Sequence, residues 1–156
     1  MATKITGVFS GKIMTQAVSA LIHEDNHALT LVEVVGTQKS SDPLWDGAKI
    51  TYWGTGDLVN GNGSQKGYWC NERADGDRDW GTFEGKITTS GQQVSMEGTY
   101  KLTGGTGKFK GINGGGKYKG HFPSATDVVN DWDGVYTLAS SNQAPAPPTG
   151  LTAVVQ

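Results

Sequence analysis

The feature that most constrains the fold of this chain is a glycine-rich run from Gly104 to Gly120 in which one short unit occurs twice. The units are Gly107-Lys-Phe-Lys-Gly111 and Gly116-Lys-Tyr-Lys-Gly120, each with one aromatic residue between two lysines. A glycine in a helix interior costs ~1 kcal/mol relative to alanine, so the run is not helical. Glycine suits tight turns and closely approaching strands, because it has no Cβ. The run therefore predicts an all-β chain.

Alternation of apolar and polar residues along most of the chain also predicts strands. The segments that alternate in this way are 5–10, 12–22, 28–35, 49–59, 66–73, 79–89, 92–102, 117–122 and 134–138. Tight turns are indicated at Ser90-Gly91, Asn60-Gly61 and Asp75-Gly76-Asp77. Long hairpins with many glycines favour closure of the sheet over a sandwich. We expect a single antiparallel up-and-down, calycin-like barrel of eight strands.

Composition limits the classes of protein that this chain can belong to. Its 156 residues, net charge of −2 and single cysteine argue for one domain without an intrachain disulfide and against a nucleic-acid-binding surface. No run approaches the ~20 apolar residues of a membrane span, and no signal peptide is visible, which slightly favours the cytoplasm. We expect a barrel domain over residues 1–139 and a proline-rich tail or linker over 140–156. Two longer connections, 37–47 and 123–133, are expected to cap the barrel or form a lid.

The glycine-rich run also resembles a known signature. Gly105-Thr-Gly-Lys-Phe-Lys-Gly-Ile-Asn-Gly-Gly-Gly-Lys-Tyr-Lys-Gly120 is similar to a segment of the allene oxide cyclase-like barrel superfamily, which includes allene oxide cyclases, dirigent proteins and many bacterial barrels. The turn at Asp75-Gly76-Asp77, followed by Trp80, resembles that of the bacterial members. The resemblance implies an apolar or aromatic small molecule held inside the barrel, chemistry without a metal or organic cofactor, and assembly into dimers or trimers. It assigns no catalytic residue.

Four residues are candidates for proton transfer. Glu33 lies among apolar neighbours, and a carboxyl facing the barrel interior would have a raised pKa; facing outward, it would be an ordinary surface residue. Tyr68 and Glu72 share one face of segment 66–73 with Cys70, although the opposite face, with Trp69, is an equal candidate for the interior. His23 is placed near the barrel rim, where it would act as a general base.

Seven residues are candidates for ligand binding. Tyr52 is followed on the same face by Gly54 and Gly56, which leave space above its ring unless large neighbours fill it. Trp45 and Trp132 fall in the two long connections, where they would form a lid, plug the barrel end or make a subunit interface. The full set of expected ligand-binding residues is Tyr52, Trp53, Cys70, Trp45, Trp132, Phe83 and Met96.

Metal binding is the weaker interpretation of two acidic clusters. His23, Glu24, Asp25 and His27 lie close together, but a hairpin turn explains them better than a zinc site with a complete ligand set. The sequence from Asp75 resembles the start of a calcium loop, but it has Lys86 where the twelfth-position glutamate belongs. We therefore expect no metal site.

The sequence is consistent with two main candidate functions and a third that ranks below them. The first is a cofactor-free isomerase, cyclase or lyase acting inside the barrel on an apolar or aromatic molecule by proton transfer and conformational templating. The second is a non-catalytic barrel that binds a hydrophobic ligand. The third is a structural module with a fully packed interior and an extensive subunit contact.

Overall fold

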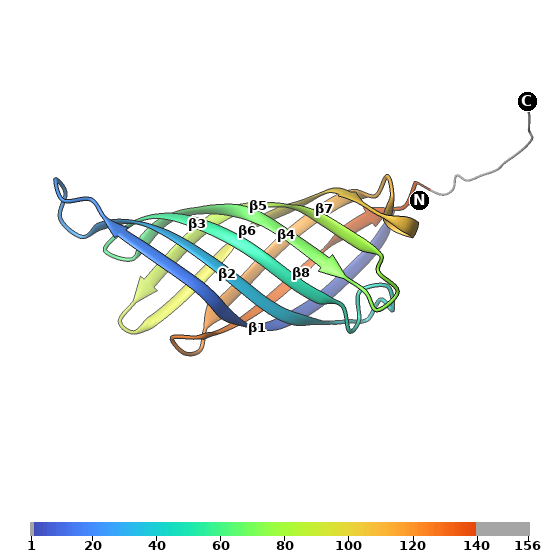
Figure 1. The fold of residues 1–156 in the computed structure, drawn as a ribbon, viewed down its shortest axis with the longest axis horizontal. Helices are drawn as coiled ribbons and strands as arrows, with labels where there is room; N and C mark the ends of the chain where they lie inside the picture. Colours follow the sequence, from blue (N-terminus) through green and yellow to red (C-terminus); the bar gives the residue numbers. More distant parts are fainter. Residues whose placement is uncertain (1, 140–156) are drawn as a thin grey trace, which may run out of the picture.

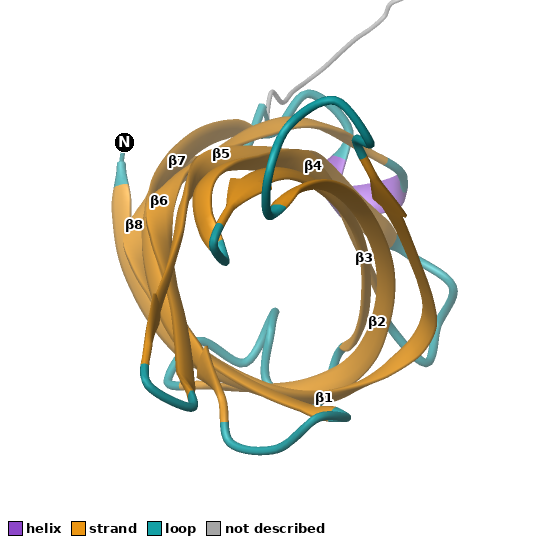
Figure 2. Ribbon diagram, turned by 90° about the vertical axis from the view of Figure 1, so that its left-hand side faces the viewer, coloured by secondary structure: helices purple, strands orange, loops and turns teal. Residues whose placement is uncertain are grey.

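The computed structural model describes residues 2–139, which form a closed barrel of eight strands (Figure 1). Each strand pairs antiparallel with the next, and β8 closes the barrel against β1, as the view along the axis shows (Figure 2). The strands are β1 (Thr3–Ala20), β2 (His27–Ser40), β3 (Lys49–Val59), β4 (Asn62–Glu72), β5 (Arg78–Ser90), β6 (Gln93–Gly105), β7 (Asn113–Phe122) and β8 (Asp127–Thr137). The up-and-down eight-stranded barrel is thereby confirmed. The tail expected at 140–156 lies outside the described residues, and within 2–139 no helix is long and apolar enough to cross a membrane.

The N-terminal strand is longer than expected. Segments 5–10 and 12–22 join into β1, which runs past the barrel so that the β1–β2 hairpin projects at one end (Figure 1). The break expected at Gly11 is wrong, because Gly11 stays in the strand opposite Gly36. A Cβ at Gly11 would lie 2.9 Å from the Val35 carbonyl oxygen, so this glycine permits close strand approach rather than a turn.

The two long connections are shorter than expected. Strand β2 continues to Ser40, and β8 begins at Asp127 instead of residue 134. Trp132 therefore lies in a strand rather than in a loop. The first part of β8, residues 127–133, was assigned to a connection because its inward face includes the polar Asn130, which hides the alternation of apolar residues.

The predicted tight turns are present. Asn60 and Gly61 have φ angles of 54° and 77°, the pair of positive values that a two-residue hairpin of this type requires. Gly91 and Gly76 also have positive φ angles, 62° and 92°. These turns fix the registers of the β3–β4, β5–β6 and β4–β5 hairpins.

The glycine-rich run seals one end of the barrel. Its two aromatic residues, Phe109 and Tyr118, are buried, the first in the short 3-10 helix η1 (Gly107–Phe109) and the second in β7. At Gly116 a Cβ would lie 1.8 Å from the Asp133 carbonyl oxygen, so the β7–β8 pair is compatible only with glycine there. Every second residue of β7 faces outward, which explains why Lys117 and Lys119 are exposed on either side of the buried Tyr118.

Candidate functional site

The barrel encloses an apolar cavity with a volume of about 80 Å³. All eight strands and the connection between β2 and β3 contribute to its wall. The lining residues are Ile5, Phe9, Gln38, Trp45, Ile50, Tyr52, Trp69, Asn71, Phe83, Met96, Tyr100, Leu102, Tyr118, Asn130, Trp132 and Tyr136. Inward-facing rings therefore dominate the wall, as in other small barrels that hold one ligand.

The rings of the wall pack edge to face. Tyr52 meets Phe9 at 5.8 Å between ring centroids and Phe83 at 5.6 Å, and Phe83 in turn meets Tyr118 at 5.8 Å. These separations and steep interplanar angles are the favourable arrangement for aromatic pairs. The space above Tyr52 is partly filled, because a Cβ at Gly54 would touch the Phe83 ring at 3.3 Å. The cavity remains beside these rings. The space expected above Tyr52 is therefore filled in part by a large neighbour and left open in part.

Two buried polar atoms of the cavity wall have no hydrogen-bond partner. They are the Tyr52 hydroxyl and the Asn130 side-chain carbonyl oxygen. An unsatisfied buried group costs about 1–3 kcal/mol, and each such group in a native structure calls for an explanation. Burial also raises the pKa of Tyr52 well above its ordinary value, so the phenol stays protonated and able to donate. Tyr52 and Asn130 therefore have one donor and one acceptor that no protein group satisfies.

A chain of hydrogen bonds crosses the barrel on one side of the cavity. The Trp132 indole N–H donates to Gln38 Oε1 at 2.9 Å, and Gln38 Nε2 donates to Asn71 Oδ1 at 3.0 Å. Asn71 Nδ2 then donates to the Asp79 carboxylate at 3.3 Å. The chain links β8, β2, β4 and β5, so it fixes the orientation of three side chains in the cavity wall.

The packed side chains of Trp45 and Phe109 form a plug at the end of the barrel where η1 lies, and Asp79 and Arg73 anchor it. Asp79 is fully buried and forms an ion pair with Arg73. Its carboxylate also accepts a hydrogen bond from the Trp45 indole N–H at 3.4 Å. Arg73 also donates to the Leu44 carbonyl at 2.8 Å, and its guanidinium lies 3.9 Å from the centre of the Phe109 ring. Burial raises the pKa of Asp79, and the Arg73 guanidinium opposes that shift. The plug therefore closes one end of the cavity.

The opposite end is more open. Inward-facing apolar side chains there are only half-buried, in contrast to those around the plug: Val32, Leu58, Ile87, Val94 and Phe122. This end faces the projecting β1–β2 hairpin (Figure 1).

The four residues expected to transfer protons lie outside the cavity. Glu33 is on the outer face of β2, where it accepts the Trp53 indole N–H at 2.9 Å. Tyr68 is largely exposed on the outside of β4, and Glu72 pairs with Arg78 at 2.7 Å on the same outer surface. His23 is exposed in the β1–β2 turn. Of the two orientations left open for β2 and β4, burial shows that the faces with Gln38 on β2 and with Trp69 and Asn71 on β4 point inward.

The expected ligand-binding residues divide between the two faces of the sheet. The structure places Tyr52, Trp45, Trp132, Phe83 and Met96 in the cavity wall. Trp53 and Cys70 face outward, and burial raises the pKa of the partly buried Cys70 thiol. The alternative face of segment 66–73, with Trp69 inside, is the one the structure adopts.

Sequence reasoning missed the polar residues of the cavity wall, Gln38, Asn71 and Asn130, and the buried Asp79 that Asn71 contacts. The one available signal was the alternation of Asn71 with Trp69, which places both on the same face. Nothing in the sequence pairs Asp79 with its partners from other strands. Among residues 2–139, no three histidine, cysteine or acidic side chains gather in a way that could hold a metal ion.

Comparison with known proteins shows the fold alone. No family model and no curated protein matches the sequence. Among solved structures, the pterocarpan synthase dirigent protein GePTS1 matches with a TM-score of 0.50 and 14% identity, covering 87% of this chain and 88% of that one. The chain therefore shares the eight-stranded barrel of a dirigent protein, in agreement with the dirigent-like part of the resemblance noted in the sequence.

Proposed function

We propose that this barrel binds a small apolar or aromatic molecule carrying one hydroxyl or similar polar group and holds it in a defined orientation. One observation carries the proposal: two residues that line the aromatic-walled cavity, Tyr52 and Asn130, have a buried hydroxyl donor and a buried amide-oxygen acceptor without a partner. A hydroxyl group can accept from the first and donate to the second. Apolar walls with a few polar groups are the usual form of a small-molecule site.

The size of the cavity sets the size of the ligand. Its volume of about 80 Å³ is roughly half of the 150 Å³ of an engineered apolar cavity that admits benzene. A single aromatic ring therefore enters only if a wall side chain moves. Phe83 is the best placed to move, because it is only partly buried and lies over Gly54. Ligands much larger than one ring would require opening of the barrel at its hairpin end.

The fold supports a templating role. The structural neighbour is named a pterocarpan synthase dirigent protein, and it shares the barrel fold of this chain. From this similarity we propose only that a barrel of this shape can bind and orient a small molecule. The finer proposal, membership of the allene oxide cyclase-like group and its bacterial branch, rests on the glycine-rich signature.

Proton-transfer catalysis is the second candidate, favoured by Asp79. Its carboxyl has a pKa raised by burial and lies 3.3 Å from the amide of Asn71 in the cavity wall. An isomerase, cyclase or lyase step would need Asn71 or Trp45 to move aside, since Asp79 does not itself line the cavity. Turnover that is lost in Asp79→Asn while binding is retained would support this candidate.

The binding proposal is tested with the matched probes p-cresol and toluene. We expect p-cresol to bind roughly 2- to 10-fold more tightly, the factor that corresponds to a net hydrogen bond of about 0.5–1.5 kcal/mol. Isothermal titration calorimetry gives both affinities, and methyl NMR of Met96 locates the ligand. Tyr52→Phe should abolish the preference, whereas Tyr68→Phe on the outer surface should keep it. Failure of both probes to bind, or shifts confined to outward-facing residues, would overturn the proposal.

A further inference from the structure

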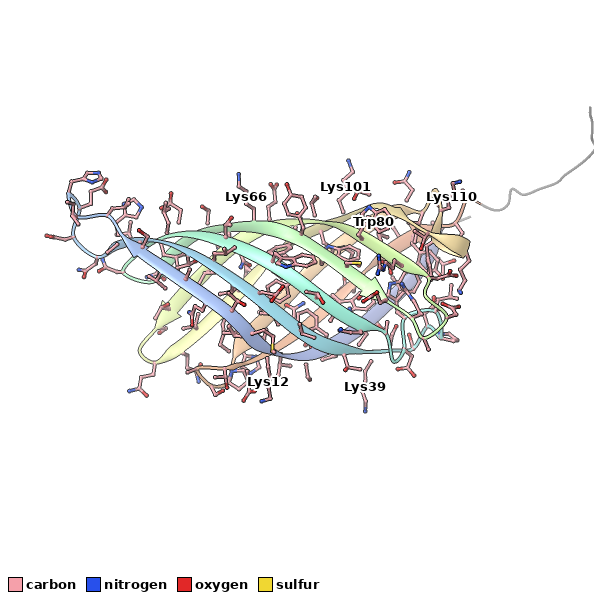
Figure 3. All side chains as sticks on the ribbon, viewed as in Figure 1. Lys12, Lys39, Lys66, Trp80, Lys101 and Lys110 are labelled. Carbon is pink, nitrogen blue, oxygen red and sulfur yellow. The ribbon has the colours of Figure 1, made fainter. Side chains whose placement is uncertain are left out.

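A row of aromatic side chains runs across the outer surface of three neighbouring strands. Trp53 on β3, Tyr68 on β4 and Trp80 on β5 are 40%, 65% and 37% exposed. Trp53 lies directly opposite Tyr68, and Trp80 lies opposite Cys70, two residues along from Tyr68. Side chains so placed are about 5 Å and 7–8 Å apart, so the three rings form a continuous patch. Figure 3 shows Trp80 on the outside of the barrel between Lys101 and Lys110.

The two indoles of this aromatic row are held in place. The Glu33 carboxylate accepts the Trp53 N–H at 2.9 Å. The Trp80 ring lies over Gly104 of the neighbouring strand, where a Cβ would come within 2.7 Å of the indole nitrogen. Rings fixed before binding lose less entropy when a partner arrives. The row is therefore preorganised for contact, with charged side chains only at its margins.

The described chain ends in line with the aromatic row. Along the hydrogen-bonding direction, Tyr136 of β8 pairs with Gly114, Gly114 with Leu102, and Leu102 with Gly81, the residue after Trp80. Three strand spacings separate β8 from β5, a distance of about 14 Å. The five steps from residue 139 to residue 144 can span at most about 17 Å. The chain that follows can thus reach Trp80.

The sequence beyond residue 139 has the chemistry that such a row recognises. Residues 144–148 are Ala-Pro-Ala-Pro-Pro, and 140–156 contain no charged side chain. Proline-rich segments favour the polyproline II helix and dock on aromatic-lined surfaces with little entropy loss. Five residues in that conformation extend about 15 Å, which spans the row from β5 to β3.

We propose that residues 144–148 dock on the aromatic row of the same chain, with proline rings packed against Trp80, Tyr68 and Trp53. The docked segment covers an apolar patch that would otherwise be open to water or to other proteins. This interaction surface lies outside the barrel and is independent of ligand binding in the cavity.

The test uses the full-length chain labelled with ¹³C and ¹⁵N. Nuclear Overhauser effects are expected between the ring protons of Pro145, Pro147 and Pro148 and those of the three aromatic residues. Tyr68→Thr, which keeps a strand-forming residue, should remove these effects. The matched control Val135→Thr, exposed on β8 away from the row, should retain them.

A mixed sample separates contact within one chain from contact between chains. Labelled and unlabelled full-length protein are combined, and isotope-filtered spectra select effects between different molecules. Proline–aromatic effects within the labelled chain alone support the proposal. Effects between molecules would overturn it in favour of exchange between copies, and absence of any proline–aromatic effect would overturn it outright.

Discussion

Replacement of Arg73 by methionine tests whether the ion pair with Asp79 holds the plug of the barrel. The substitution keeps a long side chain but removes the charge that faces a fully buried carboxylate. It also removes the hydrogen bond to Leu44 and the cation–π contact with Phe109. Asp79 then retains only its neutral partners, Asn71 and the Trp45 indole.

The expected loss is large because a buried charge is left without its counterion. Breaking a buried pair by removing one partner typically costs about 3–5 kcal/mol. For a domain of this size, each kcal/mol lowers Tm by about 2–4 °C, so Arg73→Met should lower Tm by about 6–20 °C. Asp79→Asn in the Arg73→Met background should recover part of that loss, because the amide carries no charge.

Thermal and urea unfolding followed by circular dichroism at pH 7 measures these differences. The matched control is Arg78→Met, which makes the same change on the outer surface, where the Arg78–Glu72 pair is substantially exposed. Exposed pairs contribute about 0–1 kcal/mol. A loss for Arg73→Met that does not exceed the loss for the control would refute the role of the ion pair.

The same variant has a distinct pH dependence. Burial raises the folded-state pKa of Asp79 above its unfolded value, so stability due to this group is greatest at low pH and falls as pH rises through the folded pKa. Removing Arg73 takes away the charge that lowers this pKa, which raises it further. The deficit of Arg73→Met relative to the native chain should therefore be smallest in acid and grow towards neutral pH.

Three further predictions concern other parts of the barrel. Phe109→Ala should destabilise the protein by about 3–5 kcal/mol in urea unfolding, because the ring is fully buried and its removal leaves a cavity. Gly116→Ala should prevent regular pairing of β7 with β8, since the added Cβ would meet the Asp133 carbonyl oxygen at 1.8 Å; hydrogen exchange of these two strands measures this. Hydrogen bonds to Asp57 and then to Glu24 raise the pKa of His27. Hydrogen-exchange protection of the β1–β2 hairpin should therefore be full below the ordinary histidine pKa and should fall as pH rises through the raised pKa. An NMR pH titration measures both the His27 pKa and the protection of the hairpin amides.

The closed barrel was predictable because its signals are local. Turns such as Asn60-Gly61 require positive φ angles, which glycine and asparagine adopt more readily than other residues. The glycine-rich run excluded an α-helix there, and alternation set most strand positions to within a few residues. These constraints involve neighbouring residues, so the sequence contains them directly.

The sequence did not predict which face of each strand points into the barrel, because alternation separates odd-numbered from even-numbered residues without saying which set is inside. Alternation in β4 separates Tyr68 and Cys70 from Trp69 and Asn71, but it does not say which set points inward. The inner face contains buried polar residues, and the outer face of β2 contains Leu29 and Leu31, about half exposed. Hydrophobicity therefore does not distinguish the faces, and the partners that satisfy the inner polar groups come from distant strands.

The plug connects stability to the proposed binding site. Trp45 lines the cavity and donates to Asp79, so a loosened Arg73–Asp79 pair should also disturb the cavity wall. A ligand that binds only the folded barrel stabilises it in proportion to the logarithm of its concentration over Kd. Arg73→Met should therefore weaken p-cresol binding as well as stability, whereas Arg78→Met should change neither appreciably. Since Tyr68 faces the opposite side of the sheet, Tyr68→Thr should release residues 144–148 without altering affinity for the ligand, which would establish that the two faces of the barrel act independently.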